Sequence, residues 1–487
     1  MSDGRRSARA AGKVSTAILI SRILGLVRDQ FFAKLFGAGL YNDAWLVALR
    51  LPNILRDLFA EGALSAAFVP TFTSYLKNKG RQDAWQLANL VLSALMVLLG
   101  LFTLILLYFS DSFVHLLAAG FSDVPGKVEI TATLIKILSP FLLLVAMASV
   151  AMGMLNTLNH FFLPALAPAV FNVSLIAAAI FLVPQFEDQG ILPIYAMGVG
   201  AVVGGLLQFG VQIPLLWKEG FRFRPGINLH HPGLQRLGRL IGPAIVGVSA
   251  VQINVLVNTQ IASFLQDNGP VSWLSFAFRI MYLPIGLFGV AVGIVNLKEV
   301  SALAATESMQ ELKETVANSL KLVGFLAIPS TVGLVLLAEP IVGVLFERGS
   351  FTSADTRFTS YALMAYGLGL FAYSSVKVYV PTFYALNDTR TPVRNTLVAV
   401  ATNVVANLTL IMILPQGYRF IGLALGTSLS VTLNSSLLAV HFRRRLGSMR
   451  EFGIGTNLWK TALAALLMGG AVVLLNRYAR LSWVEMK

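Results

Sequence analysis

Long apolar runs separated by short polar breaks cover almost the whole chain. An α-helix of about 20 apolar residues is long enough to cross a lipid bilayer, so each run predicts one membrane span. The second run is longer than the others and is interrupted near Pro52 and Gly62. The thirteen predicted spans are 15–36, 41–76, 84–110, 128–157, 162–184, 190–217, 235–265, 271–297, 312–346, 354–380, 392–414, 420–442 and 457–476.

The composition indicates the same class of protein. Only 12% of the 487 residues are charged, about half the share of a soluble domain. This supply is too small to cover a soluble surface, which excludes soluble enzymes, nucleic-acid binders and disordered scaffolds. The chain has no cysteine, so disulfides and thiolate metal sites are excluded, and its five histidines show no ligand spacing. The sequence predicts an all-α polytopic membrane protein.

The net charge of +14 is unevenly distributed between the loops. Alternate breaks are basic, namely 77–81, 218–239, 377–394 and 441–450, whereas 37–43, 184–190 and 266–270 are neutral or acidic. Basic loops stay in the cytoplasm. The basic segment 1–14 has no clean apolar core of a signal peptide, so we expect a cytoplasmic N-terminal tail. No loop is long enough to hold a soluble domain.

The two halves of the chain resemble each other. Leu158-Asn159 matches Leu386-Asn387, and Pro164 matches Pro392 with the same offset along the chain. Ala88-Asn89 matches Ala317-Asn318, and Leu51-Pro52 matches Leu283-Pro284, at a similar separation. Six spans per half return the chain to the same side, which predicts parallel repeats. The expected domains are a tail (1–14), a six-helix bundle (15–217), a linker (218–234), a second six-helix bundle (235–446) and an extra C-terminal helix region (447–487).

The charged residues of the first, second and eighth predicted spans point to a function, because each centrally placed charge costs on the order of 3 kcal/mol in contact with lipid. In the first span, Arg22 and Asp29 lie within about 20° of each other on a regular helix, and Arg28 lies on another face. The eighth span carries Arg279 without a carboxylate in its own helix. Its partner is therefore another helix, a backbone carbonyl or an anionic ligand.

The second span carries the longest polar stripe. Asp43, Arg50, Asp57 and Glu61 fall within an arc of about 40° if the helix is regular, although Pro52 will bend it, and Asn53 and Arg56 flank the stripe. Two interpretations stay open, and both can hold. The arginines only neutralise the carboxylates, or they line a wet, slightly cationic cavity and bind an anion, for which the planar guanidinium suits phosphate.

Four segments resemble one known family. They are residues 21–39 (SRILGLVRDQFFAKLFGAG), 43–70, 271–284 (VSWLSFAFRIMYLP) and 383–394 (FYALNDTRTPVR). They are similar to the MurJ (MviN) family of lipid II flippases, in the multidrug/oligosaccharidyl-lipid/polysaccharide exporter superfamily, and the resemblance covers nearly the whole chain. It implies two six-helix bundles around a central cavity and two C-terminal helices beside a lipid-facing groove. Only the first of those two helices is expected within this sequence, so either the sequence is shortened or the groove is incomplete.

The resemblance also implies site residues. The substrate-binding arginines are Arg22, Arg28, Arg56 and Arg279, and the polar and acidic cavity residues are Ser21, Asp29, Asp43, Asn53, Glu61 and Ser272. Some members bear an Asp where this chain has Phe278, which leaves Arg279 less neutralised here. Some members bind sodium, and the matching positions are Asn258, Asn403, Asn407 and Thr427. All four are neutral, which argues against a sodium site, and no other metal is expected.

The expected function is a non-enzymatic flippase that moves undecaprenyl-diphosphate-linked disaccharide pentapeptide between leaflets of the bacterial cytoplasmic membrane by alternating access. We find no GxxxxGK[ST] phosphate loop, so coupling to a monovalent cation or to the membrane potential is expected in place of a cofactor. Expected partners are lipid II, membrane lipids and cell-wall synthesis proteins, not nucleic acid, and the expected state is a monomer. The alternatives are a flippase for another polyprenyl-diphosphate glycan, a cation-coupled drug exporter, a membrane glycosyltransferase or phosphatase using Asp43, Asp57 and Glu61, and a passive scaffold.

Overall fold

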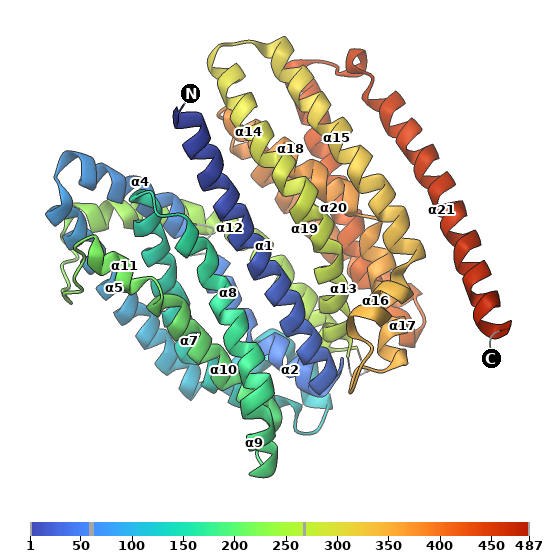
Figure 1. The fold of residues 1–487 in the computed structure, drawn as a ribbon, viewed down its shortest axis with the longest axis horizontal. Coiled ribbons are helices and arrows are strands. Elements are labelled where there is room, and N and C mark those ends of the chain that lie inside the picture. Colours follow the sequence, from blue (N-terminus) through green and yellow to red (C-terminus); the bar gives the residue numbers. More distant parts are fainter. Residues whose placement is uncertain (1, 58–62, 266–268, 486–487) are drawn as a thin grey trace. The chain divides into compact units, whose positions relative to one another are not determined.

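The computed structural model describes the backbone of residues 2–57, 63–265 and 269–485, and the side chains of 14–57, 67–242, 252–265 and 269–475. Across these ranges the chain is helical and contains no β-strand (Figure 1). It divides into two compact units. Unit 1 comprises Met1–Asn268 with Arg348–Phe351, and unit 2 comprises Gly269–Glu347 with Thr352–Lys487.

Unit 1 is built around one interior helix. Its helices are α1 (Ser2–Phe36), α2 (Leu40–Ala48), α3 (Arg50–Arg56), α4 (Ala63–Asn78), α5 (Arg81–Tyr108), α6 (Ser110–Ala118), α7 (Lys127–Thr157), α8 (Phe162–Ala177), α9 (Val183–Asp188), α10 (Pro193–Gly210), α11 (Ile213–Lys218) and α12 (Pro232–Ser263). A π-helical turn, Ala178–Leu182, joins α8 to α9. The most apolar stretch of α7 is 72% buried, whereas the other candidate membrane spans are 17–44% buried. α7 contacts α2, α3, α4, α5, α6 and α10 and is therefore the core of the unit.

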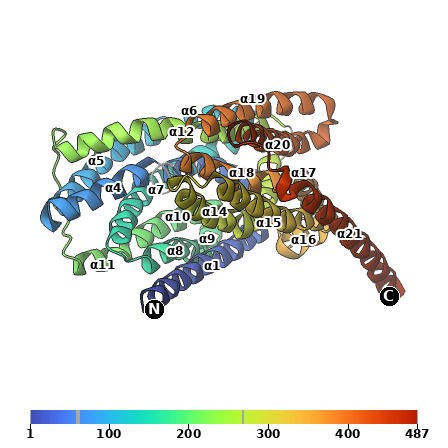
Figure 2. The ribbon, with the colours of Figure 1, turned by 90° about the horizontal axis from the view of Figure 1, so that it is seen from above.

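Unit 2 contains α13 (Pro270–Pro284), α14 (Val290–Ala305), α15 (Met309–Leu336), α16 (Ala338–Phe346), α17 (Ser353–Gly367), α18 (Leu370–Ala385), α19 (Arg390–Ile413), α20 (Arg419–Leu446) and α21 (Ile454–Glu485). A π-helical turn, Ile285–Gly289, joins α13 to α14. α17 and α18 form a pair bent by 44°. α21 packs on α15 and lies at the edge of its unit (Figure 2), which confirms a single extra C-terminal helix among the described residues.

Nine helices of the described chain are long and apolar enough to cross a membrane, or ten if the α17–α18 pair counts as one span. They match ten of the thirteen predicted spans and confirm the fold class. The other three predicted spans lie on α1, on α2 to α4, and on α12. α1 carries Arg22, Arg28 and Asp29 in its apolar part, the α2–α4 region is divided into short helices, and the middle of α12 lies outside the described side chains. These three stay predictions.

The internal repeat is visible in the helix bounds. The offset that relates Asn159 to Asn387 also relates both ends of α5 to those of α15, and both ends of α6 to those of α16. The two asparagines adopt positive φ, at 65° and 56°. Each follows a helix that ends in the same Schellman motif. Asn159 N–H donates to Asn156 O and His160 N–H to Leu155 O, and the second half repeats both bonds at the corresponding positions.

The division between the units does not follow the predicted linker 218–234. α12 packs on α4 and α6 and therefore belongs to unit 1, so the compact units separate after Asn268. Compactness alone does not test whether 15–217 and 235–446 act as functional bundles. That division and the predicted central cavity stay predictions.

Candidate functional site

A polar cluster joins α1 to α8. Arg28 donates through Nε and Nη2 to Oδ1 of Asp29, at 3.0 and 2.8 Å, and through Nη1 to Oδ1 of Asn172, at 2.9 Å. Asn172 in turn donates to the backbone carbonyl of Ser21, at 3.1 Å. α1 and α8 pack side by side along their length (Figure 1). Four polar groups therefore meet in an apolar contact, and the Arg28 guanidinium is held on two sides. Asn172 was not among the predicted site residues.

Arg22 differs from Arg28. It is half-buried on α1, and it makes no hydrogen bond or ion pair with any residue in the described part of the chain. Asp29, the carboxylate expected on its face, is 6% exposed and pairs with Arg28 instead. Seven residues along a helix separate Arg22 from Asp29 by about 10 Å of axial rise, whereas Arg28 is adjacent. The helical periodicity placed Arg22 and Asp29 on the same face of α1, but it did not predict that Arg28 would pair with Asp29 instead.

The second predicted span is not one regular helix. α2 ends at Ala48 and α3 begins at Arg50. Pro52 has no N–H for the carbonyl of Ala48, and its ring collides with that carbonyl, so the helix breaks one turn before the proline. Asp43 and Asp57 consequently lie on separate helical segments, which corrects the prediction of one continuous polar stripe. Glu61 lies outside the described residues.

Asp43 forms a buried ion pair that the sequence did not predict. Its Oδ2 accepts from Nζ of Lys127 on α7 at 2.9 Å, and the two side chains are 1% and 3% exposed. Nζ also lies 4.2 Å from the ring centroid of Phe121. In unit 2 the corresponding helices, α13 and α17, are joined by Trp273 Nε1, which donates to Asp355 at 2.9 Å. The two halves therefore share a polar contact between corresponding helices, but it is an ion pair in unit 1 and a hydrogen bond from an indole in unit 2.

The predicted residues of α3 are more exposed. Nη2 of Arg56 lies 3.0 Å from Oδ1 of Asp57, with side chains 48% and 33% exposed. Gln252 of α12 donates to the other oxygen of Asp57 at 3.2 Å. Asn53 is half-buried nearby on the same helix. An exposed pair of this kind contributes little stability, so Arg56 remains available to a ligand at little cost.

Ser272 and Arg279 lie on α13 in unit 2, Ser272 fully buried and Arg279 half-buried. The ring of Phe278, the residue before Arg279, contacts three tyrosine rings. Its centroid lies 5.8 Å from Tyr282, 5.4 Å from Tyr366 and 6.2 Å from Tyr373. The residue before Arg279 therefore packs against aromatic rings and supplies no negative charge.

The residues of the predicted ion site divide between the units. Asn403 and Asn407 of α19 and Thr427 of α20 meet in unit 2, whereas Asn258 lies on α12 of unit 1. Asn407 donates to Asn403 at 3.1 Å, and Asn403 donates to Thr427 at 3.4 Å. The second bond joins α19 to α20, and hydrogen bonds between helices stabilise their contact inside a membrane. In the described chain no three His, Asp or Glu side chains gather as a metal site would require.

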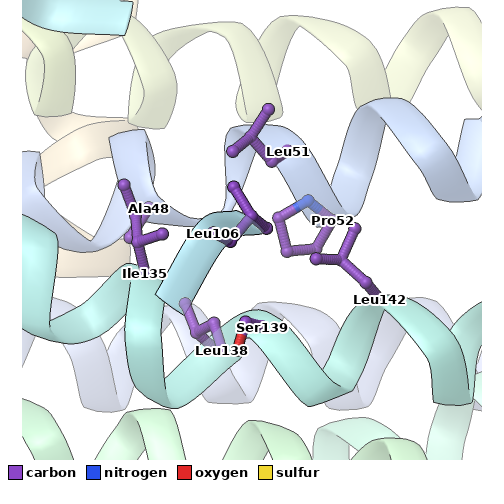
Figure 3. A pocket seen from close by; sticks show the side chains of 8 residues that line it. All are labelled: Ala48, Leu51, Pro52, Leu106, Ile135, Leu138, Ser139 and Leu142. Carbon is purple, nitrogen blue, oxygen red and sulfur yellow. The ribbon is translucent and has the colours of Figure 1, made fainter. Parts of the chain in front are cut away.

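One small pocket lies beneath the α2–α3 break (Figure 3). It has an empty volume of about 140 Å³, and its lining comes from α2, α3, α5 and α7. Seven of the eight lining residues are apolar, and the eighth, Ser139, donates its hydroxyl to the carbonyl of Lys136. A pocket of this polarity does not suit a phosphate group, because nothing in it replaces hydration. It is not the anion site.

Comparison with known proteins gives a consistent result. A family model described as "Lipid II flippase MurJ" matches residues 32–487. The "Probable lipid II flippase MurJ" of Vibrio cholerae serotype O1 is 38% identical over 432 residues, covering 87% of this chain and 81% of that protein. The protein of the same description from Haemophilus influenzae is 34% identical over 475 residues, covering 93% and 90%.

Solved structures agree. One described as "Lipid II flippase MurJ, inward closed conformation" has a TM-score of 0.80 and 28% identity, and covers 95% of this chain and 92% of its own. An inward-facing multidrug transporter of the MATE family has a TM-score of 0.74 at 14% identity, covering 91% and 99%. Similarity at 14% identity concerns the fold alone.

Proposed function

Because the chain belongs to the lipid II flippase MurJ family, we propose that it is a multi-pass membrane protein that moves lipid II from the inner to the outer leaflet of the bacterial cytoplasmic membrane. The substrate is a polyprenyl diphosphate linked to a disaccharide pentapeptide. Its diphosphate is an anion that must cross apolar surroundings, so the transporter needs cations that replace the lost hydration.

The observation that carries the proposal is the state of Arg22. A half-buried arginine without a hydrogen bond or ion pair among the described residues is costly inside a membrane unless a ligand compensates it. The guanidinium fork binds phosphate through two parallel hydrogen bonds. Arg28, held by Asp29 and Asn172, supplies a second, oriented cation further along α1. Arg56 and Arg279 complete the proposed set.

The transport cycle follows from these charges. The headgroup enters the site from the cytoplasmic side, and the arginines bind the diphosphate while the polyprenyl chain stays in lipid. Alternating access then exposes the site to the other side. An inside-negative membrane potential favours outward movement of an anion by about 2.3 kcal/mol per charge per 100 mV. Arginines that moved with the headgroup would reduce this contribution.

Among the alternatives, another polyprenyl-diphosphate glycan would use the same arginines, and only substrate tests separate it from lipid II. A cation-coupled drug exporter needs an acidic cavity. In the described part of unit 1, Asp29 and Asp43 are both occupied by basic side chains, which leaves them poorly placed to bind a cationic drug.

The test combines complementation of a cell depleted of its lipid II flippase with lipid II binding to purified protein. We expect wild type to support growth, and Arg22→Ala and Arg279→Ala to lose both growth and binding at normal protein levels. Arg22→Lys should recover only part, because a point charge cannot make the two-pronged contact. Arg239→Ala, which removes an exposed arginine of α12, is the matched control. Unchanged lipid II binding by Arg22→Ala would refute the proposed role, and failure of wild type to complement would refute the substrate.

A further inference from the structure

The segment that connects α11 to α12 is fastened to α5 by side chains. Residues 221–229, here called the strap, contain no helix up to Asn228. Asn89 of α5 donates through Nδ2 to the carbonyl of Arg222, at 3.1 Å, and accepts through Oδ1 from the N–H of Arg224, at 2.9 Å. Ser93, one turn further along, accepts from the N–H of Gly226 at 3.1 Å. Two polar side chains of a membrane helix thus hold an extended chain as a neighbouring strand would.

Every second residue of the strap is apolar, and the residues between are polar, apart from Gly226. Its odd-numbered positions are Phe221, Phe223, Pro225, Ile227 and Leu229, and its even-numbered positions include Arg222, Arg224 and Asn228. Successive side chains of an extended chain point to opposite sides, so one edge is apolar and the other is basic. Phe221 anchors the apolar edge in the core at 2% exposure, but Phe223, Ile227 and Leu229 are 40%, 66% and 65% exposed.

Both arginines are accessible. Arg222 is exposed, and its Nη1 donates to the carbonyls of Trp217 and Phe221, which fixes the guanidinium beside the chain. Arg224 is exposed, and its side chain makes no hydrogen bond or ion pair within the described residues. The only acidic residue near them in sequence, Glu219, is already bonded to His160 and Arg81. The basic edge therefore keeps its positive charge.

The strap lies where α5 enters the lipid-facing part of the molecule. The large exposed apolar side chains of α5 run from Val97 to Tyr108, and Ser93 is one turn before Val97. α5 has 28 residues, or about 42 Å, which exceeds the roughly 30 Å of bilayer hydrocarbon by about two turns. Trp217, 53% exposed at the end of α11, is a residue type enriched at the membrane–water interface. The strap is thus at the boundary of the membrane, on the side of the basic loops.

We propose that the strap is a binding site for acidic phospholipids, with Phe223, Ile227 and Leu229 inserted among the upper acyl carbons and Arg222 and Arg224 bound to headgroup phosphates. An interface of this kind needs an apolar face and a basic face on one element, and the alternation provides both. The site is independent of the transported substrate, because it lies on the outside of unit 1, between its last helices and α5. Asn89 and Ser93 position the strap and do not touch the lipid.

The experiment uses the absence of cysteine from the native chain. A single cysteine at Ile227 or at Asn228 is labelled with a fluorophore, and the full chain is placed in nanodiscs that contain a lipid with a shallow quencher. The two positions are neighbours in sequence but on opposite edges of the strap. We expect strong quenching at 227 and weak quenching at 228. Equal and weak quenching at both would place the strap in water, where a protein partner would be the occupant, and would overturn the proposal.

The charge requirement is tested by the lipid that carries the quencher. Quenching at 227 should be stronger with quencher on phosphatidylglycerol than on phosphatidylcholine, and the half-saturating fraction of phosphatidylglycerol should rise by about fivefold for each arginine removed. Arg222→Gln with Arg224→Gln should remove this preference, whereas Arg236→Gln with Arg239→Gln, which removes the same charge from exposed positions of α12, should keep it. Two results would refute lipid recognition by the strap. One is quenching in the native strap that does not depend on the lipid headgroup, and the other is an equal loss of the phosphatidylglycerol preference in both double variants.

Discussion

Replacing Asp43 by asparagine is expected to destabilise unit 1 severely, because it leaves a buried cation behind. Lys127 is 3% exposed and lies 2.9 Å from the Asp43 carboxylate. Asparagine keeps the size of the side chain and one acceptor oxygen for the Lys127 ammonium, so the change removes mainly the charge. Lys127→Met, the complementary change, removes the cation that pairs with the buried carboxylate at 2.9 Å.

The magnitude follows from the burial. Removing one partner of a buried ion pair costs about 3–5 kcal/mol, because the remaining charge is neither hydrated nor compensated. The contact between Lys127 and the Phe121 ring offsets a small part of that cost in Asp43→Asn, about 0.5–2 kcal/mol. Removing both charges, as in Asp43→Asn with Lys127→Met, should return the free energy of unfolding to within about 1 kcal/mol of wild type. The coupling between the two sites should therefore amount to several kcal/mol.

The assay is a double-mutant cycle, with the free energy of unfolding measured in detergent micelles by fluorescence. The exposed pair on α3 is the control: Arg56→Gln and Asp57→Asn should each cost about 0–1 kcal/mol, because their side chains are 48% and 33% exposed. If the Asp43 and Lys127 variants cost as little as the α3 variants, the pair is not buried in the membrane-embedded protein, and the reasoning fails.

The same variants separate two roles of Asp43. If Asp43 only compensates Lys127, the charge-free double variant should support growth of flippase-depleted cells although each single variant fails. If Asp43 contacts the substrate, the double variant should be stable and still fail. Growth of the Asp43→Asn single variant at wild-type rates would contradict both roles.

Three further expectations concern other parts of the chain. Exchanging Arg22 and Asp29 should abolish complementation, because it removes the carboxylate that pairs with Arg28 and places two cations side by side at positions 28 and 29. An exchanged protein that supports growth would show that Arg22 and Asp29 act only as an ion pair. The hydrogen bond from His160 lowers the pKa of Glu219 below 4.5, against the effect of partial burial. The Glu219 carboxylate therefore stabilises the fold fully above pH 4.5, and this stabilisation is lost as the pH falls through the lowered pKa. The difference in unfolding free energy between wild type and Glu219→Gln should shrink on acidification. Asn159→Gly should leave stability almost unchanged, whereas Asn159→Ala should cost about 1 kcal/mol, because its φ is positive; equal unfolding free energies would refute the strain.

The membrane fold could be predicted because hydrophobic length is a local property of the chain. Ten predicted spans match apolar helices, and the paired Asn159 and Asn387 indicated the repeat because a left-handed residue after a helix favours glycine or asparagine. The division at Leu49 could have been placed from Pro52 by the rule that proline disrupts the turn before it.

The partners of the charged residues could not be predicted, because partnership depends on tertiary contact. Lys127 is 84 residues from Asp43 and begins an apolar run, where it reads as the edge of a loop. Asn172, 144 residues from Arg28, lies in an apolar helix and is uncharged, so the sequence does not indicate it as a partner of an arginine. Helical arcs place Arg22 beside Asp29, but they do not say which of two arginines will occupy one carboxylate.

The repeated contacts of the two halves have a consequence for how residue roles are assigned. Where α2 meets α7 the link is a cation with a carboxylate, and where α13 meets α17 it is an indole with a carboxylate. Just after α7, His160 pairs with Glu219, and at the corresponding place just after α18, Asp388 pairs with Arg445. A duplicated ancestor would explain shared positions with divergent chemistry. Superposing the halves therefore predicts where two side chains meet. It does not predict which of them is acidic or basic, so a role established for a residue of one half does not apply to its counterpart. Low pH or high salt should consequently lower the stability of the two halves by different amounts.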